Sequence, residues 1–147
     1  MNIVPATSDT EIEACYPLFQ LLRPHLIGED FVARVRRQES AGYRLIYLQD
    51  AKKKVAAAAG FRILEFLAWG RVVYVDDLIT LPEQRGSGYG GALMDWLIGH
   101  AREQECDELH LDSGYQRNDA HRLYLNKGLQ LGGHHFSMKL KAKAQKA

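Results

Sequence analysis

The chain has 147 residues, which fits one domain long enough to bury a core of its own. Hydrophobic residues make up 46% of it and charged residues 25%, a balance typical of globular proteins and unlike that of disordered ones. Lys and Arg outnumber Asp and Glu by 19 to 18, so the formal charge of +1 carries no electrostatic footprint of a nucleic-acid binder. Since no apolar run approaches the ~20 residues that span a bilayer, we expect no membrane partner either.

We expect a cytoplasmic protein whose single domain covers residues 1–147. Residues 1–5 lack the charged start and the apolar stretch of a signal peptide. The two cysteines, Cys15 and Cys106, are too few for a disulfide framework and fit free thiols in a reducing compartment. Residues 141–147 are expected to form a frayed, solvated tail.

Changes of hydrophobic period along the chain predict an alternation of strands and helices. Thr7, Ser8 and Asp9 supply capping side chains, and apolar residues then recur at three- and four-residue steps until Pro24 ends the first helix. In chain order we expect a strand at 2–6, helices up to Pro24 and at 29–39, strands at 44–48, 55–64 and 71–81, a helix at 89–104, a strand at 108–112, a helix at 118–126 and the last strands within 129–140.

The order of these elements, β-α-α-β-β-β-α-β-α-β, predicts an α/β fold with a mixed central sheet flanked by helices. Three consecutive strands joined by short loops within residues 44–81 favour an antiparallel meander. The helix at 89–104 lies between two strands in the βαβ manner, and such a crossover connects parallel neighbours. The sheet should therefore contain both kinds of pairing.

The strongest local signal is a glycine-rich turn, residues 85–91 (RGSGYGG), between a strand and the helix that follows it. Its glycines allow consecutive backbone amides to point into one concavity without clashes of Cβ atoms. The helix adds its positive amino-terminal end, and Arg85 can add a fixed charge. The turn therefore predicts a site for a diphosphate-bearing cofactor.

Two other interpretations of the turn are open. Gly86-x-Gly88-x-x-Gly91 matches the dinucleotide-binding fingerprint, with Asp112 near the place of a ribose-binding carboxylate, and would indicate a small oxidoreductase. That fold needs further parallel strands after Asp112, where only 35 residues remain, and it normally carries its glycine turn after the first strand. The second interpretation is that the turn is only a tight connection between a strand and a helix and binds no ligand. The lysine and hydroxyl residue of a P-loop are absent.

Arg85-x-x-Gly88-x-Gly90, preceded by a strand that contains Leu78-Ile79-Thr80, resembles the cofactor signature of the GNAT superfamily, the acetyl-CoA-dependent N-acetyltransferases. The resemblance implies acetyl-CoA as cosubstrate, with its pyrophosphate on the amides of the turn and its acetyl-pantetheine against backbone groups of the strand. By this resemblance the cofactor-binding residues are Leu78, Ile79, Thr80, Arg85, Gly86, Ser87, Gly88, Tyr89, Gly90, Gly91 and Asn118.

A second segment supports the resemblance at the right distance along the chain. Residues 118–125 (NDAHRLYL), followed by Gly128, are similar to the second CoA-side motif of the family, although Leu129 replaces the usual Phe. Tyr124 is the candidate catalytic acid, because a phenol near the sulfur can protonate the departing thiolate. The alternative is that Tyr124 is a buried aromatic residue of the helix and takes no part in catalysis. Asn118 either hydrogen-bonds the cofactor or caps the helix.

Asp76 and Asp77 place two carboxylates within an otherwise apolar strand. Neighbours on a strand point to opposite faces, so one of them would enter the core unless a bulge or a cleft receives it. Polyamine acetyltransferases of the family have a similar acidic pair, and the resemblance suggests Asp76 as catalytic base, directly or through water, and Asp77 as a binder of a cationic amine. The alternative is that one carboxylate pairs with Arg71 or another structural base.

We therefore expect an N-acetyltransferase that transfers the acetyl group of acetyl-CoA to a primary amine of a small cationic molecule, by direct attack in a ternary complex. A non-catalytic acyl-CoA-binding module is an alternative. Neither the six histidines nor the cysteines show the spacing of a metal site or of a covalent nucleophile, so no metal is expected, although His121 could line the site. Members of the family often form dimers, so a homodimer is an open possibility.

Overall fold

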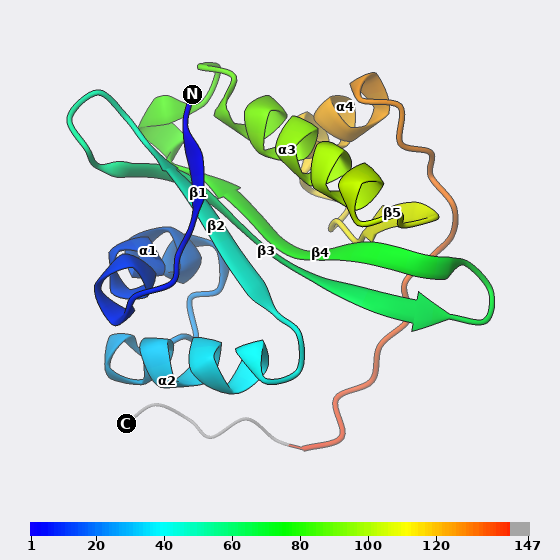
Figure 1. Cartoon of the computed structure of the whole chain (residues 1–147), viewed down its shortest axis with the longest axis horizontal. Helices are drawn as coiled ribbons and strands as arrows, with labels where there is room; N and C mark the ends of the chain where they lie inside the picture. Colours follow the sequence, from blue (N-terminus) through cyan, green and yellow to red (C-terminus); the bar gives the residue numbers. More distant parts are fainter. Residues whose placement is uncertain (142–147) are drawn as a thin grey trace.

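A five-stranded sheet of strand order β1-β2-β3-β4-β5 forms the centre of the structure, a computed structural model that describes residues 1–141 (Figure 1). In chain order the elements are β1 (Ile3–Pro5), α1 (Asp9–Leu22), α2 (Gly28–Glu39), β2 (Arg44–Gln49), β3 (Val55–Phe66), β4 (Gly70–Thr80), the short 3-10 helix η1 (Pro82–Gln84), α3 (Tyr89–Glu103), β5 (Glu108–Leu111) and α4 (Asn118–Asn126). The predicted α/β class is confirmed.

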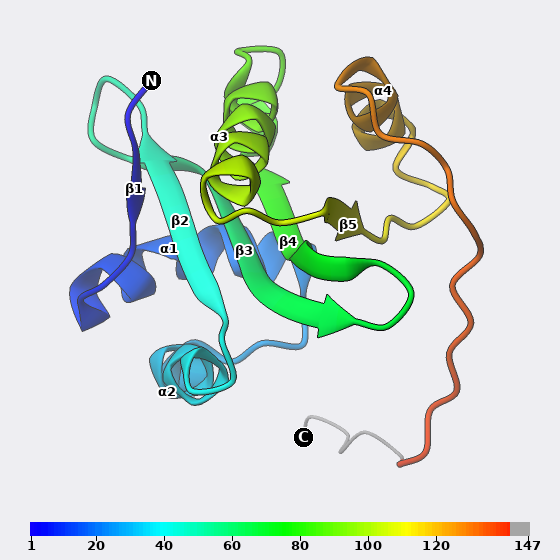
Figure 2. The same cartoon turned by 45° about the vertical axis from the view of Figure 1, so that its right-hand side comes forward.

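Strands β1 to β4 form the predicted antiparallel meander, and β5 joins the far side of β4 in parallel, so the sheet is mixed as expected. Helices α1 and α2 cover one face, and α3 covers the other (Figure 2). Alternate residues of β2 enter the two cores: Leu45 and Tyr47 pack on the side of α1, and Ile46 and Leu48 pack on the side of α3. A strand buried on both faces has a continuous apolar sequence, which explains why β2 does not alternate with polar residues.

The start of α1 has the capping side chains that the sequence predicts. Ser8 accepts a hydrogen bond from the Glu11 backbone N–H, and the Glu11 carboxylate accepts one from the Ser8 N–H, which makes a capping box. The other Glu11 oxygen accepts a hydrogen bond of 2.9 Å from the Tyr47 hydroxyl of β2. The cap therefore also ties α1 to the sheet. None of the helices within the described residues is long and apolar enough to cross a membrane.

The Glu11 cap predicts a pH dependence of stability. Its hydrogen bonds, first those from Ser8, lower the pKa of Glu11 from 4.5 to about 2. A carboxylate with a lowered folded-state pKa stabilises the fold above its unfolded pKa and loses that contribution as the pH falls through the folded one. Glu11→Gln should therefore have a lower melting temperature than the wild type at pH 7, and the difference should vanish between pH 4.5 and pH 2. A difference that stays constant over this range would contradict the role of the charge.

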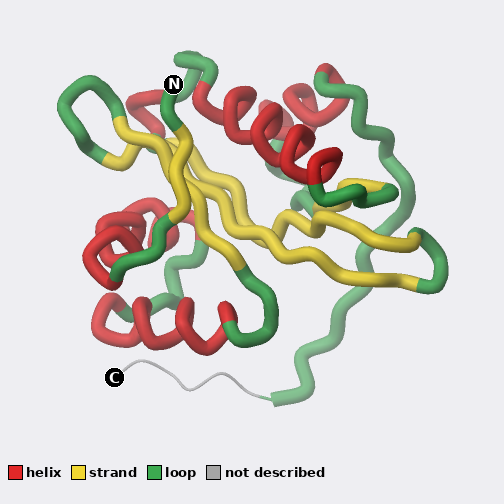
Figure 3. Tube along the Cα trace, viewed as in Figure 1, coloured by secondary structure: helices red, strands yellow, loops and turns green. Residues whose placement is uncertain are grey.

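The last strands predicted within residues 129–140 are wrong: this segment is a loop, as the green tube after α4 shows in Figure 3. Its apolar residues do not share one face. Leu129 and Leu131 occupy odd positions, whereas Phe136 and the apolar residues after it occupy even positions, and Gly132-Gly133 lies between the two sets. Glycine weakens a strand, and a change of parity turns the apolar side chains to the other face. The predicted tail at 141–147 lies almost wholly outside the described residues.

Candidate active site

A cavity opens where β4 and β5 stop pairing. The parallel ladder ends at Val75 and Leu111, but β4 continues to Thr80 while the chain after β5 turns into a loop. On its other side β4 stays paired with β3 as far as Thr80. The cavity wall comes from the end of α1, from β4, from the loop after β5 and from α4. The lining residues are Leu22, Arg23, Val75, Asp76, Asp77, Leu78, Leu111, Asp112, Ser113, Gly114, Arg117, Ala120 and Tyr124.

A β-bulge brings both acidic residues of β4 to this cavity. Asp77 is opposite Gly60 of β3 and Val75 is opposite Phe61, so Asp76 has no partner of its own in the ladder. The extra residue changes the direction of neighbouring side chains on the bulged strand. Two adjacent carboxylates on a strand avoid the core only with a bulge or a cleft, and the structure contains both.

Asp77 is fixed by two side chains from distant parts of the chain. The Tyr43 hydroxyl donates a hydrogen bond of 2.9 Å to Oδ2, and Arg23 Nη2 donates one of 3.1 Å to Oδ1. Only 15% of the Asp77 side chain is exposed, and this burial raises the pKa of Asp77 although Tyr43 and Arg23 oppose the shift. Asp77 thus has a higher proton affinity than an exposed aspartate, which suits a group that exchanges protons.

Asp76 is paired with Arg62 of β3. The guanidinium Nη2 lies 2.6 Å from Asp76 Oδ2, and Nε contacts both carboxylate oxygens at 3.1 and 3.2 Å. Gln38 of α2 accepts a further hydrogen bond of 2.9 Å from Arg62 Nη2. The alternative that a carboxylate pairs with Arg71 or another structural base is confirmed for other bases, Arg62 and Arg23, whereas Arg71 Nε donates to the backbone oxygen of Gln104. The two structural partners, Arg23 and Arg62, gave no local signal in the sequence.

Gly60 leaves room for the tyrosine that holds Asp77. A Cβ atom at this position would overlap the Tyr43 hydroxyl. Gly60→Ala should therefore displace Tyr43, lower the free energy of unfolding by about 1–3 kcal/mol as overpacked cores do, and reduce activity. Gly99→Ala is the matched control, since a Cβ there meets nothing within 4 Å and alanine is favoured within a helix such as α3. Urea unfolding of the two variants checks this; equal stabilities would contradict the tight packing.

Tyr124 of α4 faces the same cavity as the acidic pair. Burial raises the pKa of its phenol, while the nearby charge of Arg117 acts in the opposite direction. The phenol therefore carries its proton at neutral pH, as a proton donor must. Tyr124 also packs against the core cluster that contains Leu93, so it is both a partly buried aromatic residue of the helix and a residue of the cavity wall.

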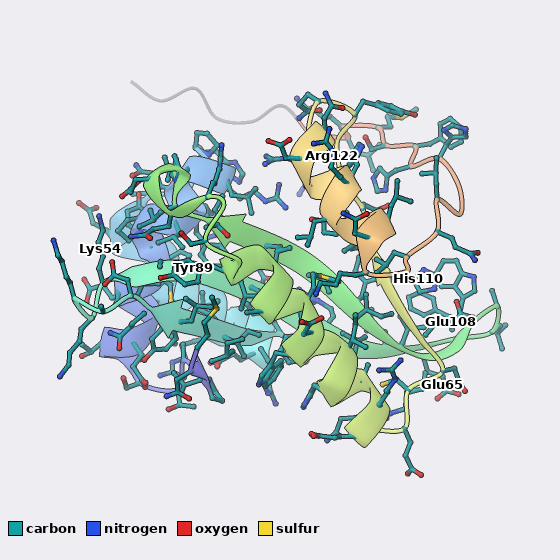
Figure 4. All side chains as sticks on the ribbon, turned by 90° about the horizontal axis from the view of Figure 1, so that it is seen from above. Lys54, Glu65, Tyr89, Glu108, His110 and Arg122 are labelled. Carbon is teal, nitrogen blue, oxygen red and sulfur yellow. The ribbon has the colours of Figure 1, made fainter. Side chains whose placement is uncertain are left out.

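The glycine-rich turn follows η1, and its last three residues, from Tyr89 on, form the start of α3 (Figure 4). Gly86 and Gly88 have φ angles of 84° and 82°, a backbone region that residues with side chains rarely adopt. Gly88 is the N-cap of α3 and supplies no capping side chain, and the first turn contains no acidic residue. The amides at the start of α3 thus lack side-chain acceptors within the described structure. This end of the helix fits a phosphate group.

Helix α4 packs directly on this turn. A Cβ on Gly90 would lie 3.3 Å from Leu123, and one on Gly91 would lie 3.6 Å from Lys127. An ion pair of 2.8 Å joins Lys127 to Asp95 of α3. The glycines therefore leave the start of α3 without a capping side chain and allow α4 to approach. The turn and the Tyr124 cavity are held together by the same helix.

Asn118, Ile79 and His121 are the remaining candidate residues of the site. Asn118 is the first residue of α4, and the N-cap of this helix is Arg117. No side chain makes a capping hydrogen bond there, so the alternative that Asn118 caps the helix is wrong. Ile79 points into the core on the side of α1, which leaves only its backbone to a ligand. His121 contacts the Ser113 hydroxyl at 3.1 Å beside the cavity.

The histidine on β5 has a structural environment. His110 stacks on Trp69 at a ring distance of 4.0 Å and contacts Glu108 at 2.7 Å, close to the other end of the sheet (Figure 4). Among residues 1–141 no group of three or more His, Cys, Asp or Glu side chains could hold a metal ion. Asp112, the proposed ribose-binding carboxylate of the dinucleotide alternative, accepts a hydrogen bond from the Tyr74 hydroxyl.

Comparisons with known proteins agree with this geometry. The model of the acetyltransferase (GNAT) family matches residues 11–129. The chain belongs to the GNAT family. It is 31% identical to the uncharacterized N-acetyltransferase YhdJ of Bacillus subtilis over 122 residues, which cover 82% of this chain and 85% of that protein. This GNAT chain is therefore an acyltransferase, and acetyl-CoA is the cosubstrate of its family.

Other similar proteins include two whose names state an acceptor. The aminoalkylphosphonate N-acetyltransferase of Salmonella typhimurium is 32% identical over 66 residues, which are 45% of this chain and 43% of that protein. A putative acetyltransferase from Agrobacterium tumefaciens has a TM-score of 0.80 at 21% identity, with 95% of this chain and 99% of that chain covered. An aminoglycoside antibiotic 6'-N-acetyltransferase from Acinetobacter baumannii has a TM-score of 0.78 at 19% identity, with 97% and 99% covered. These structures share the GNAT fold.

Proposed function

We propose that the chain acetylates a primary amine of a small molecule in the cavity between β4 and β5. The observation that carries this proposal is that the cavity brings a pair of carboxylates, Asp76 and Asp77, together with the phenol of Tyr124. An amine needs a proton acceptor before it can attack, and the sulfur that leaves needs a proton donor. The cavity holds one group suited to each role.

The cofactor residues fit acetyl-CoA. We assign its diphosphate to the backbone amides of residues 85–91, with Arg85 as a fixed positive charge, and its pantetheine arm to the free edge of β4 at Leu78–Thr80 and to Asn118. Support comes from the uncapped start of α3 and from the unpaired edge of β4 beyond Val75. When bound, acetyl-CoA supplies the acetyl group as a thioester. A backbone N–H of β4 can polarise the thioester carbonyl.

For the proton acceptor we keep Asp76, acting directly or through water, with Asp77 fixed beside it. Asp76 keeps 24% of its side chain exposed, compared with 15% for Asp77, although the oxygens of both carboxylates already accept hydrogen bonds. The sequence also favoured a cationic small molecule because of this acidic pair. Arg23 and Arg62 neutralise the two carboxylates, so the pair supports binding of the ammonium group itself rather than of a polycation.

Thiol release from acetyl-CoA, measured with and without a panel of primary amines, tests the proposed function. We expect release that depends on the amine and a product whose mass corresponds to the N-acetyl amine. If acetyl-CoA raises the melting temperature but no amine releases thiol, the chain is the non-catalytic acyl-CoA-binding module instead. The relatives' names span aminoalkylphosphonates and an aminoglycoside antibiotic, so the panel should include both.

A further inference from the structure

The cavity beside Tyr124 is lined by basic side chains as well as acidic ones. Arg23 enters the wall from the end of α1, and Arg117 enters from the N-cap of α4. Arg23 holds Asp77, but it keeps further N–H groups, Arg117 has no such structural partner among the described residues, and a guanidinium group repels an ammonium ion. The arginines therefore need an explanation of their own.

Each carboxylate at the cavity already has a partner. Asp77 accepts from Arg23 and Tyr43, and Asp76 accepts from Arg62, which lies behind the wall. Asp112 accepts from the Tyr74 hydroxyl and lies 3.4 Å from His135 Nδ1. No lining carboxylate within the described residues is left without a donor.

The basic groups keep unused hydrogen-bond capacity. The described hydrogen bonds of Arg23 all come from Nε and Nη2, which leaves the N–H groups of Nη1 for a ligand, and 42% of the side chain is exposed. The Arg117 side chain is exposed and forms no ion pair or hydrogen bond with the residues that the structure describes. A guanidinium presents its N–H groups as a planar fork that fits the oxygens of a carboxylate or phosphonate.

The charges around the cavity balance. Three carboxylates, Asp76, Asp77 and Asp112, line the cavity with the guanidinium groups of Arg23 and Arg117, and Arg62 pairs with Asp76 from behind the wall. A diamine would bring a second positive charge to a wall that already has two arginines. An acceptor with an ammonium group at one end and an oxyanion at the other offers the complementary arrangement, because each of its charges meets its opposite.

We infer that the acceptor is a small zwitterion whose primary amine lies close to an oxyanionic group, a carboxylate or a phosphonate, and that Arg23 and Arg117 bind the oxyanion. The inference rests on the proposed function. It defines Arg23 and Arg117 as determinants of specificity rather than of the chemical step. The acidic pair keeps its role at the amine end of the same molecule.

Four amines test the inference: propylamine, and three compounds in which three methylene groups separate the amine from the second group, 1,3-diaminopropane, 4-aminobutanoate and 3-aminopropylphosphonate. Two-, four- and five-carbon series of the same four types cover other lengths. We expect kcat/KM of the wild type to be at least about 10-fold higher for the best oxyanionic amine than for the monoamine or diamine of equal length, as for a charge-assisted hydrogen bond. Comparison of the carboxylate and phosphonate arms identifies the oxyanion.

Variants show whether the arginines cause the preference. Arg23→Gln and Arg117→Gln should each lower the ratio of kcat/KM for the oxyanionic amine over propylamine by about 10-fold, mostly through KM. The ratio cancels any general damage, including a disturbance of Asp77 in Arg23→Gln. Arg122→Gln is the matched control, since Arg122 lies on α4 with an exposed side chain and does not line the cavity (Figure 4).

Different outcomes separate this inference from the proposed function. Equal kcat/KM for all amines, a preference for the diamine, or a ratio unchanged in both variants would overturn the inference while acetyl transfer stands. A higher KM for acetyl-CoA in Arg117→Gln, with the amine ratio unchanged, would remove Arg117 from the acceptor site. Absence of thiol release with every amine would overturn the proposed function, and the inference with it.

Discussion

Tyr124→Phe should lower kcat by about 10²-fold or more, because removal of the hydroxyl deprives the leaving sulfur of its proton donor. The ring that packs against the core remains, so the melting temperature should change little. The affinity for acetyl-CoA should also stay close to that of the wild type, since the hydroxyl acts on the leaving group rather than on the bound ground state. Steady-state kinetics with a thermal-shift titration measure both quantities.

Tyr115→Phe is the matched control for this variant. Tyr115 lies in the loop after β5, its side chain is 81% exposed, and its hydroxyl contacts His134 rather than the cavity. It should retain wild-type turnover. Unchanged kcat in Tyr124→Phe would remove Tyr124 from the chemistry and leave it as a helix aromatic.

Asp76→Asn should lower kcat/KM by about 10²-fold near neutral pH, as expected for the loss of a general base. The loss should be largest at low pH, where almost all of the amine is protonated. It should shrink as the pH rises toward the pKa of the amine, because free amine no longer needs a base. A pH–rate profile of the variant against the wild type shows this trend.

Asp77→Asn distinguishes the two carboxylates. A smaller loss than in Asp76→Asn, without the same dependence on pH, would agree with a supporting role for Asp77. A loss in Asp76→Asn that is flat across pH would contradict the assignment of the base, and a larger, pH-dependent loss in Asp77→Asn would transfer it to Asp77, whose burial raises its pKa. Melting temperatures of both variants are needed, because each leaves an arginine without its partner.

Much of the fold could be predicted because its signals are local. The capping residue Ser8 gave the start of α1, and the glycines of residues 85–91 gave the boundary between β4 and α3. The bounds of α4 match the prediction, 118–126. The final strand failed because strand formation needs a partner edge and a consistent face, and residues 129–140 change parity at Gly132-Gly133.

The site could be predicted only in part. Three motifs, each made of residues that are close together in the sequence, pointed to the turn, to Tyr124 and to the acidic pair. The partners of that pair could not be found in this way, since Arg23 and Asp77 are 54 positions apart and Arg62 and Asp76 are 14 apart on neighbouring strands. Arg117 was missed for the same reason, because only the fold brings the N-cap of α4 to the end of β4.

Hydrogen–deuterium exchange with and without acetyl-CoA tests most directly whether the glycine turn and the cavity form one site. We expect slower exchange of backbone amides in residues 85–91 and at Leu78–Thr80 when acetyl-CoA is added, and no such change with NADH. Protection by NADH, or exchange at both segments that acetyl-CoA leaves unchanged at saturating concentration, would contradict this expectation.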